Sequence, residues 1–193
     1  MTKIKICGVS SVRDVMCANE LLLDYVGFIF YDKSRRYVDD AKAALLKAYL
    51  KPSVKAVGVF VDDSIDRIAK LVDDNIIDVV QLHGSQPKAF VEDLRYVVHV
   101  PMIQAYRVES ERDVNRVNAT LADYALVDHG QDFDFSLLGK IEKPYFLAGG
   151  LNPGNVGGLV EAYRPYAVDT SAGVESFGRK DYRKMQRFAM AVR

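Results

Sequence analysis

Short apolar segments alternate with amphipathic segments along the whole chain. The apolar segments are rich in β-branched residues and mostly uninterrupted, which is typical of strands covered on both faces in a parallel sheet. The pattern predicts eight strands, at residues 3–7, 25–30, 54–61, 77–82, 98–107, 124–128, 145–147 and 166–170.

The segments between these strands carry apolar residues at the spacing of helices that pack through one face. Ser64 is placed to cap a helix over residues 65–72. Asn152 and Pro153 are predicted to be the N-cap and the first residue of another helix. The sixth connection is the exception, because residues 134–138 leave room for about one helical turn.

Eight strand–helix units in unbroken alternation predict an α/β fold, a closed (β/α)8 TIM barrel. We expect a single domain over residues 1–193 with short loops, since such barrels usually have at least about 200 residues. A doubly wound open sheet is the alternative. It is disfavoured because the first strand ends in the sequence Cys7-Gly8-Val9-Ser10 and is not followed by the glycine-rich dinucleotide fingerprint.

The composition is that of a globular protein, with 49% hydrophobic and 27% charged residues. Lys plus Arg and Asp plus Glu each number 26, and this balance argues against a nucleic-acid partner, which usually selects a basic excess. The two cysteines, Cys7 and Cys17, have no zinc-binding spacing and are not expected to be bridged. We find no signal-peptide pattern and no apolar run of membrane-spanning length, so we expect no membrane partner and a cytoplasmic location.

In a (β/α)8 barrel the functional residues lie at the carboxyl ends of the strands. Small residues follow the last two predicted strands, namely Gly149, Gly150, Ser171, Ala172 and Gly173. Loops at these two positions commonly bind a phosphate group through backbone N–H groups, although ordinary turn formation would also explain the small residues. A phosphorylated small molecule is therefore the expected ligand.

Six segments of the chain match one known family in order and at family-like spacing. They are KICG at 5–8, VGFIFYDKSRRYV at 26–38, VGVFVDDS at 57–64, DVVQLHG at 78–84, LAGGLNPGNV at 147–156 and AVDTSAGVES at 167–176. Through these segments, which span nearly the whole chain, the sequence resembles phosphoribosylanthranilate isomerase.

The resemblance implies an isomerase of the aldose–ketose type in tryptophan biosynthesis. The family converts N-(5′-phosphoribosyl)anthranilate to 1-(o-carboxyphenylamino)-1-deoxyribulose 5-phosphate, an Amadori rearrangement, by general acid–base catalysis. It implies no cofactor and no metal. Both a monomer and a homodimer are compatible with the sequence.

By the same resemblance, Cys7 is the general base and Asp128 the general acid, and Arg36 binds the anthranilate carboxylate. Gln81 and His83 are interpreted as orienting residues in the wall of the substrate site. A free thiol has a pKa of about 8.5, so we expect the pKa of Cys7 to be lowered. Without the resemblance, such a cysteine is more often a core residue.

The match departs from the family pattern in three places. The glycine-rich loop after the strand-six aspartate is shortened to residues 129–132 and should shield a substrate less well, unless His129 compensates. Ala172 stands where the family usually has serine, and Arg35 where it usually has proline. Asp169, at the end of the eighth strand, is interpreted as a supporting or structural acid.

Two other functions stay open at this point. One is a catalytically weakened barrel that keeps its phosphate site, which the shortened loop suggests. The other is a different sugar-phosphate isomerase or a metal-dependent epimerase. An epimerase would need histidine and acidic ligands at the ends of strands two and three, and the histidines, His83, His99 and His129, end neither strand.

Overall fold

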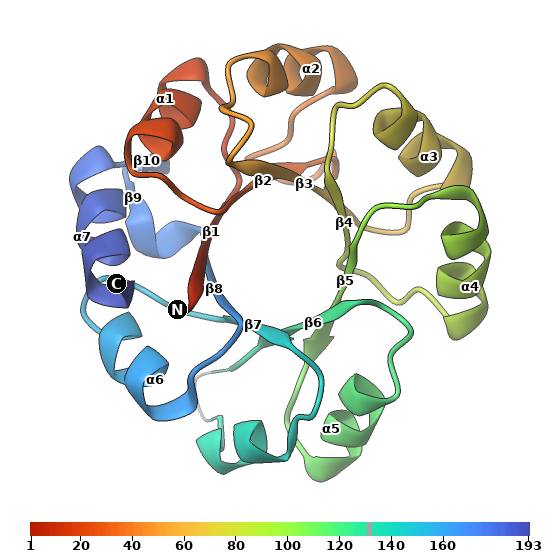
Figure 1. Cartoon of the computed structure of the whole chain (residues 1–193), viewed down its shortest axis with the longest axis vertical. Helices are drawn as coiled ribbons and strands as arrows, with labels where there is room; N and C mark the ends of the chain where they lie inside the picture. Colours follow the sequence, from red (N-terminus) through yellow and green to blue (C-terminus); the bar gives the residue numbers. More distant parts are fainter. Residues whose placement is uncertain (131–132) are drawn as a thin grey trace.

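A computed structural model describes residues 1–130 and 133–193 and places eight parallel strands in one closed barrel (Figure 1). The strands follow one another around the barrel in sequence order, and the first pairs with the eighth to close it. They are β1 (Lys3–Cys7), β2 (Tyr25–Ile29), β3 (Lys55–Phe60), β4 (Val79–Leu82), β5 (Met102–Arg107), β6 (Tyr124–Asp128), β7 (Tyr145–Ala148) and β8 (Ala167–Thr170). The predicted fold class is confirmed.

Helices form a ring outside the barrel (Figure 1). They are α1 (Val12–Glu20), α2 (Asp40–Ala48), α3 (Ile65–Asp73), α4 (Lys88–Val97), α5 (Glu111–Asn118), α6 (Val156–Tyr163) and α7 (Tyr182–Val192). The predicted cap of α3 is confirmed, since the Ser64 side chain accepts a hydrogen bond from the Arg67 N–H. None of the helices in the described ranges has the length and apolar character needed to cross a membrane.

The helix predicted to begin at Asn152 and Pro153 begins instead at Val156, with Asn155 as its N-cap residue. The Asn152 side chain accepts a hydrogen bond from the Gly154 N–H at 2.8 Å and so stabilises a turn that precedes the helix. A short polar side chain can serve either a turn or a helix start, and the local sequence does not separate the two.

Two connections also differ from the prediction. The sixth contains η1 (Phe135–Lys140), a 3-10 helix of about two turns where about one turn was expected. The predicted fifth strand began too early, because Val98 is the C-cap residue of α4 and Pro101 has no N–H group for the ladder. Between β8 and α7 lie η2 (Ala172–Val174) and a hairpin of β9 (Glu175–Ser176) and β10 (Arg179–Lys180).

Side-chain alternation along each strand divides the core into two parts. On β1, Ile4 and Ile6 belong to the apolar layer between the barrel and the helices. Cys7 packs against the second cluster, which fills the barrel. Side chains alternate between the two faces of a strand, so Lys3 and Lys5 share the inward face of Cys7. Strand β1 therefore directs two lysines and one cysteine towards the barrel interior.

Candidate active site

A cavity of about 320 Å³ opens at the carboxyl ends of the barrel strands. Most of the residues predicted from the sequence border it: Cys7, Gln81, His83, Asp128, Gly149, Gly150, Ser171, Ala172 and Gly173. Asp169, interpreted above as a supporting acid, also borders it. Arg36 borders an adjoining cavity of about 230 Å³ instead, so the structure gathers all the predicted site residues but one.

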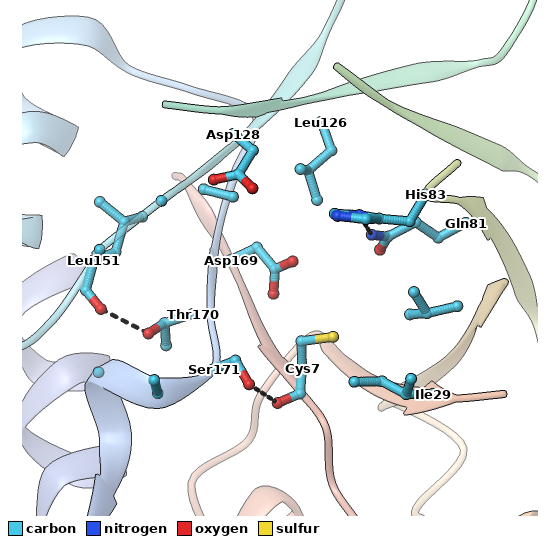
Figure 2. A pocket seen from close by; sticks show the side chains of 16 residues that line it. Cys7, Ile29, Gln81, His83, Leu126, Asp128, Leu151, Asp169, Thr170 and Ser171 are labelled. Carbon is cyan, nitrogen blue, oxygen red and sulfur yellow. Dashed lines mark hydrogen bonds between the residues drawn. The ribbon is translucent and has the colours of Figure 1, made fainter. Parts of the chain in front are cut away.

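Cys7 and Asp128 come from strands that are far apart in the sequence. Cys7 ends β1 and Asp128 ends β6. Figure 2 shows their side chains on opposite sides of the cavity, with Asp169 of β8 between them in this view. A small molecule in the cavity therefore has a thiol on one side and a carboxyl group on the other.

Gly27 in β2 makes room for the thiol of Cys7. The two residues are paired in the β1–β2 ladder, and a Cβ atom at position 27 would lie 2.8 Å from Cys7 Sγ and 3.1 Å from Cys7 Cα. Any side chain there would force the thiol to move. The sequence reasoning missed this residue, although a glycine inside a strand often marks such a close approach.

The surroundings of Cys7 raise the pKa of its thiol. Burial is the main cause, the Lys5 ammonium opposes it without cancelling it, and the charge of Asp169 adds to the increase. The expected lowering of the pKa of Cys7 is therefore wrong for the protein by itself. A thiolate at this position needs positive charge beside it.

A buried ion pair lies next to Cys7 and joins β1 to β8. Lys5 Nζ donates to Asp169 Oδ2 at 2.7 Å, and the two residues are partners in the ladder. The Lys5 side chain is 0% exposed and that of Asp169 is 7% exposed. Burial alone would lower the pKa of Lys5, but the attraction of Asp169 and Cys7 outweighs it and raises the pKa, so Lys5 keeps its charge.

Gln81 and His83 lie close together in the cavity wall (Figure 2). Gln81 Nε2 and His83 Nδ1 are 3.2 Å apart, within hydrogen-bonding distance. Among the described residues, neither Gln81 Oε1 nor Asp169 Oδ1 finds a hydrogen-bond partner, although both atoms are buried. Two buried acceptors at one cavity are suited to the hydroxyl groups of a ligand.

The loops after β7 and β8 are held against each other. Thr170 Oγ1 donates to the Leu151 carbonyl oxygen at 2.7 Å (Figure 2), and a Cβ atom at Gly173 would lie 1.9 Å from that same oxygen. Gly149 and Gly150 have φ angles of +104° and +59°. Backbone geometry thus requires glycine at positions 149 and 173, and the same loops form the rim where a phosphate group is predicted.

We expect Gly149→Ala to destabilise the protein and to disturb Asp128. The new Cβ atom would lie 2.3 Å from the His129 carbonyl oxygen and 2.9 Å from Asp128 Oδ1, at a positive φ. The free energy of unfolding should fall by more than about 1 kcal/mol, as measured by urea unfolding. The matched control is Gly158→Ala in α6, where a Cβ atom meets nothing within 4 Å and should stabilise the helix. Equal stability of the two variants would contradict this prediction.

Arg36 belongs to an ion-pair network with Glu175. Arg36 Nε donates to Glu175 Oε1 at 2.6 Å and Arg36 Nη2 to Glu175 Oε2 at 2.8 Å. Lys180 Nζ donates to Glu175 Oε1 at 2.8 Å and to the Ser171 carbonyl oxygen at 3.0 Å. Ser171 Oγ donates to the Cys7 carbonyl oxygen at 2.9 Å, so the network reaches from Arg36 to the strand that carries Cys7. Glu175 and Lys180 were missed by the sequence reasoning.

Gly8 accommodates the Arg36 side chain. Its φ angle is +77°, and a Cβ atom there would lie 2.3 Å from Arg36 Cδ. Position 8, directly after Cys7, therefore requires glycine because any side chain there would collide with Arg36.

We expect Glu175→Gln to lower the free energy of unfolding at neutral pH and to make this free energy less dependent on pH in the acidic range. Burial opposes ionisation of Glu175, but hydrogen bonds from Arg36 and Lys180 outweigh it and lower the pKa of Glu175 to about 2. A carboxyl group whose pKa is lowered by folding stabilises the folded state at pH values above the ordinary pKa of the group. This stabilisation is lost as the pH falls towards 2. Urea unfolding from pH 7 to pH 2 should show the variant less stable at pH 7, with a difference that shrinks in acid. Glu161→Gln, at an exposed position on α6, is the control, and a constant difference across the range would contradict the prediction.

His129 follows Asp128 but packs away from the cavity. Its ring centroid lies 5.5 Å from that of Phe133 and 5.1 Å from that of Phe135. In this position the His129 ring contributes to an aromatic cluster, and a compensating role for His129 stays a prediction. Gln131 and Asp132 lie outside the described residues, and the effect of the shortened loop on shielding stays a prediction.

A closed parallel barrel with a thiol, a carboxyl and an imidazole group around a cavity at the strand ends defines a (β/α)8-barrel enzyme site. The family model described as N-(5′-phosphoribosyl)anthranilate (PRA) isomerase matches residues 4–191. The N-(5′-phosphoribosyl)anthranilate isomerase of Lachnoclostridium phytofermentans is 37% identical, over 98% of this chain and 97% of the relative. The chain belongs to the phosphoribosylanthranilate isomerase family.

Two solved structures of the family agree with this assignment. The phosphoribosyl anthranilate isomerase of Thermotoga maritima is 33% identical with a TM-score of 0.90, over 100% of this chain and 98% of that one. A second structure, 34% identical with a TM-score of 0.89 over the same shares, holds reduced 1-(o-carboxyphenylamino)-1-deoxyribulose 5-phosphate. The resemblance stated from the six sequence segments is confirmed.

Proposed function

We propose that this chain catalyses the rearrangement of N-(5′-phosphoribosyl)anthranilate in tryptophan biosynthesis, with Cys7 as general base and Asp128 as general acid. Membership of the family supports the reaction. The observation that carries the two roles is the placement of Cys7 and Asp128 on opposite sides of one cavity at the strand ends (Figure 2). The reaction needs such a pair, because one proton enters the sugar ring and another leaves it.

In the first step, Asp128 donates its proton to the ring oxygen of the ribose. The bond from that oxygen to C1′ breaks, and the lone pair of the nitrogen forms a cationic C1′=N bond. In the second step, the Cys7 thiolate takes the proton from C2′. The electron pair of that C–H bond forms a C1′=C2′ double bond, and the nitrogen recovers its lone pair. The resulting enolamine gives its 2′-hydroxyl proton to water and takes one from water at C1′, so the overall change is an isomerisation. Proton exchange with water returns Asp128 to the acid and Cys7 to the thiolate for the next turnover.

The other residues of the cavity supply contacts for the remaining groups of the substrate. Gln81 Oε1 and Asp169 Oδ1 are acceptors for the ribose hydroxyls, and His83 orients Gln81. The loops after β7 and β8 bind the phosphate through Gly149, Gly150, Ser171, Ala172 and Gly173. Ala172 has no hydroxyl group to donate to the phosphate, so the backbone N–H groups supply the hydrogen bonds that a serine side chain would otherwise share.

Arg36 binds the anthranilate carboxylate through Nη1 in this proposal. Its Nε and Nη2 atoms are engaged by Glu175, and a guanidinium group has five N–H donors, so the Nη1 donors lie outside that pair. Glu175 then fixes the orientation in which Arg36 meets the substrate. The adjoining cavity that Arg36 borders also contains Gly8, next to Cys7, so the anthranilate end of the substrate would lie there.

The same proposal treats residues 1–193 as one domain that acts on a small phosphorylated molecule in the cytoplasm. No nucleic acid, membrane or cofactor takes part in it. The proposal is compatible with a monomer and with a homodimer.

The proposed reaction is tested by the fluorescence of phosphoribosylanthranilate in the presence of the purified protein. We expect the fluorescence to decay well above the rate of spontaneous hydrolysis, with 1-(o-carboxyphenylamino)-1-deoxyribulose 5-phosphate as the product. The alternative of a weakened barrel with a retained phosphate site predicts no acceleration together with measurable binding of the reduced product analogue. Calorimetric titration with that analogue separates the two outcomes.

A further inference from the structure

We propose that Lys5 is the positioning residue for the base, and that its buried ammonium, fixed by Asp169, is the counter-ion of the Cys7 thiolate. The inference rests on the proposed role of Cys7, but not on the identity of the substrate. The sequence patterns place Lys5 in the first strand and give it no function.

The backbone places Lys5 on the same face of β1 as Cys7. The two residues are two positions apart on β1 and therefore point to the same side of the strand, into the barrel. The Lys5 ammonium interacts electrostatically with the Cys7 thiol and donates a hydrogen bond, at 2.7 Å, to Asp169 Oδ2. It is not among the residues that border the cavity, so we place it behind the thiol and out of contact with substrate.

Two other cations lie within electrostatic range of Cys7, but their donors are committed elsewhere. Lys180 Nζ donates to Glu175 Oε1, to the Ser171 carbonyl oxygen and to Ser171 Oγ, which uses all three of its protons. Arg36 is held by two hydrogen bonds to Glu175. Lys5 donates its one side-chain hydrogen bond among the described residues to Asp169, and it is the cation that most strongly favours the Cys7 thiolate.

Stability alone does not explain a buried lysine at this position. Taking an ammonium and a carboxylate out of water is costly, and apolar side chains of similar size are often neutral or stabilising in place of a buried ion pair. A positive charge is useful here for another reason. The surroundings of Cys7 disfavour a thiolate, and a fixed ammonium lowers the cost of forming one each time the base acts.

The test is the pH dependence of Cys7 alkylation by iodoacetamide, which requires neither substrate nor turnover. Cys17→Ser serves as the parent background, so that Cys7 is the one thiol that reacts. In Lys5→Met we expect the alkylation profile to move to higher pH by at least about one unit, which lowers the thiolate fraction at neutral pH about tenfold. Lys5→Arg keeps the charge and should recover much of the shift. An unchanged profile in Lys5→Met would overturn the proposal.

Lys3→Met is the matched control, because Lys3 lies on the same strand but its ammonium packs over the rings of Tyr25 and Tyr166. Its alkylation profile should equal that of the parent. The groups that face Cys7 and contribute to every profile are Lys5, Asp169, Lys180 and Arg36, with His83 and Asp128 farther along the cavity wall. No other residue is replaced in Lys5→Met, but the loss of Lys5 also removes the partner of Asp169, and the Asp169→Asn background described next separates the two effects.

Loss of the lysine leaves Asp169 as an unpaired buried charge, which could unfold the variant. In that case the comparison is made between Asp169→Asn and Lys5→Met/Asp169→Asn, neither of which contains a buried carboxylate at position 169. The double variant should again alkylate at higher pH than the single one, and equal profiles would overturn the proposal.

Kinetics give a second readout that separates positioning from a structural role. In Lys5→Met the acidic limb of the pH profile of kcat/KM should move to higher pH, and KM should change little, since Lys5 does not touch substrate. A variant that loses kcat equally at every pH would show a structural defect and contradict the proposal. Should the wild-type protein fail to rearrange phosphoribosylanthranilate, the proposed function fails, while the alkylation profiles still decide the role of Lys5.

Discussion

Cys7→Ala is expected to lower kcat by about 10²- to 10⁴-fold, the usual contribution of a positioned general base. The substitution removes the group that takes the C2′ proton and leaves the loops that bind the phosphate untouched. KM should therefore stay close to that of the wild type, and binding of the reduced product analogue should be preserved. Stopped-flow fluorescence of phosphoribosylanthranilate measures kcat and KM, and calorimetry measures the binding of the reduced product analogue.

The second cysteine of the chain offers a matched control for this experiment. Cys17 lies on α1, outside the residues that border the cavity, and Cys17→Ala should retain the wild-type kcat. Loss of activity in both variants would indicate a general effect of cysteine removal. Full activity of Cys7→Ala would show that another group, or the bulk solvent, takes the proton from C2′.

Asp128→Asn is expected to lower kcat to a similar extent, by about 10²- to 10⁴-fold. The amide has nearly the same shape as the carboxyl group but cannot donate the proton that opens the ribose ring. The phosphate loops and the Lys5–Asp169 pair are unchanged, so the free energy of unfolding and the affinity for the product analogue should stay near those of the wild type. A fall in kcat without a rise in KM is thus the expected pattern.

Asp62→Asn is the control, because Asp62 follows β3 and does not border the cavity. It should keep the wild-type activity. An equal loss in the two variants would point to a change in overall charge and not to acid catalysis. Retained activity in Asp128→Asn would remove Asp128 from the mechanism and require a different acid for the ring oxygen.

Much of the fold is predictable because it depends on local patterns. Uninterrupted apolar runs at regular intervals predict buried parallel strands, and the barrel rule then places their carboxyl ends on one face. That is why the small residues after β7 and β8 could be named as site residues from the sequence. The same rule places Cys7 and Asp128 at strand ends, but their roles came from the resemblance to the family. The start of α6 was misplaced for an equally local reason, since Asn152 is as suitable for a turn as for a helix cap.

The contacts that tune the site were not predictable in this way. Lys5 meets Asp169, and Arg36 meets Glu175, only because the closure of the barrel and the hairpin after β8 bring distant segments together. Gly27 looks like any glycine in a strand until the ladder sets it beside the thiol of Cys7.

The sequence by itself determined the strand order, the residues at the strand ends and, through six matching segments, the family. The tertiary structure alone decided the charge environment of those residues. The direction of the Cys7 pKa shows the physical reason, because it depends on burial and on charges from β8 and β10 that no local pattern contains. The kind of side chain at a strand end can therefore be read from the sequence. The pKa of that side chain depends on the charges and the burial around it, and these are known only in the assembled barrel.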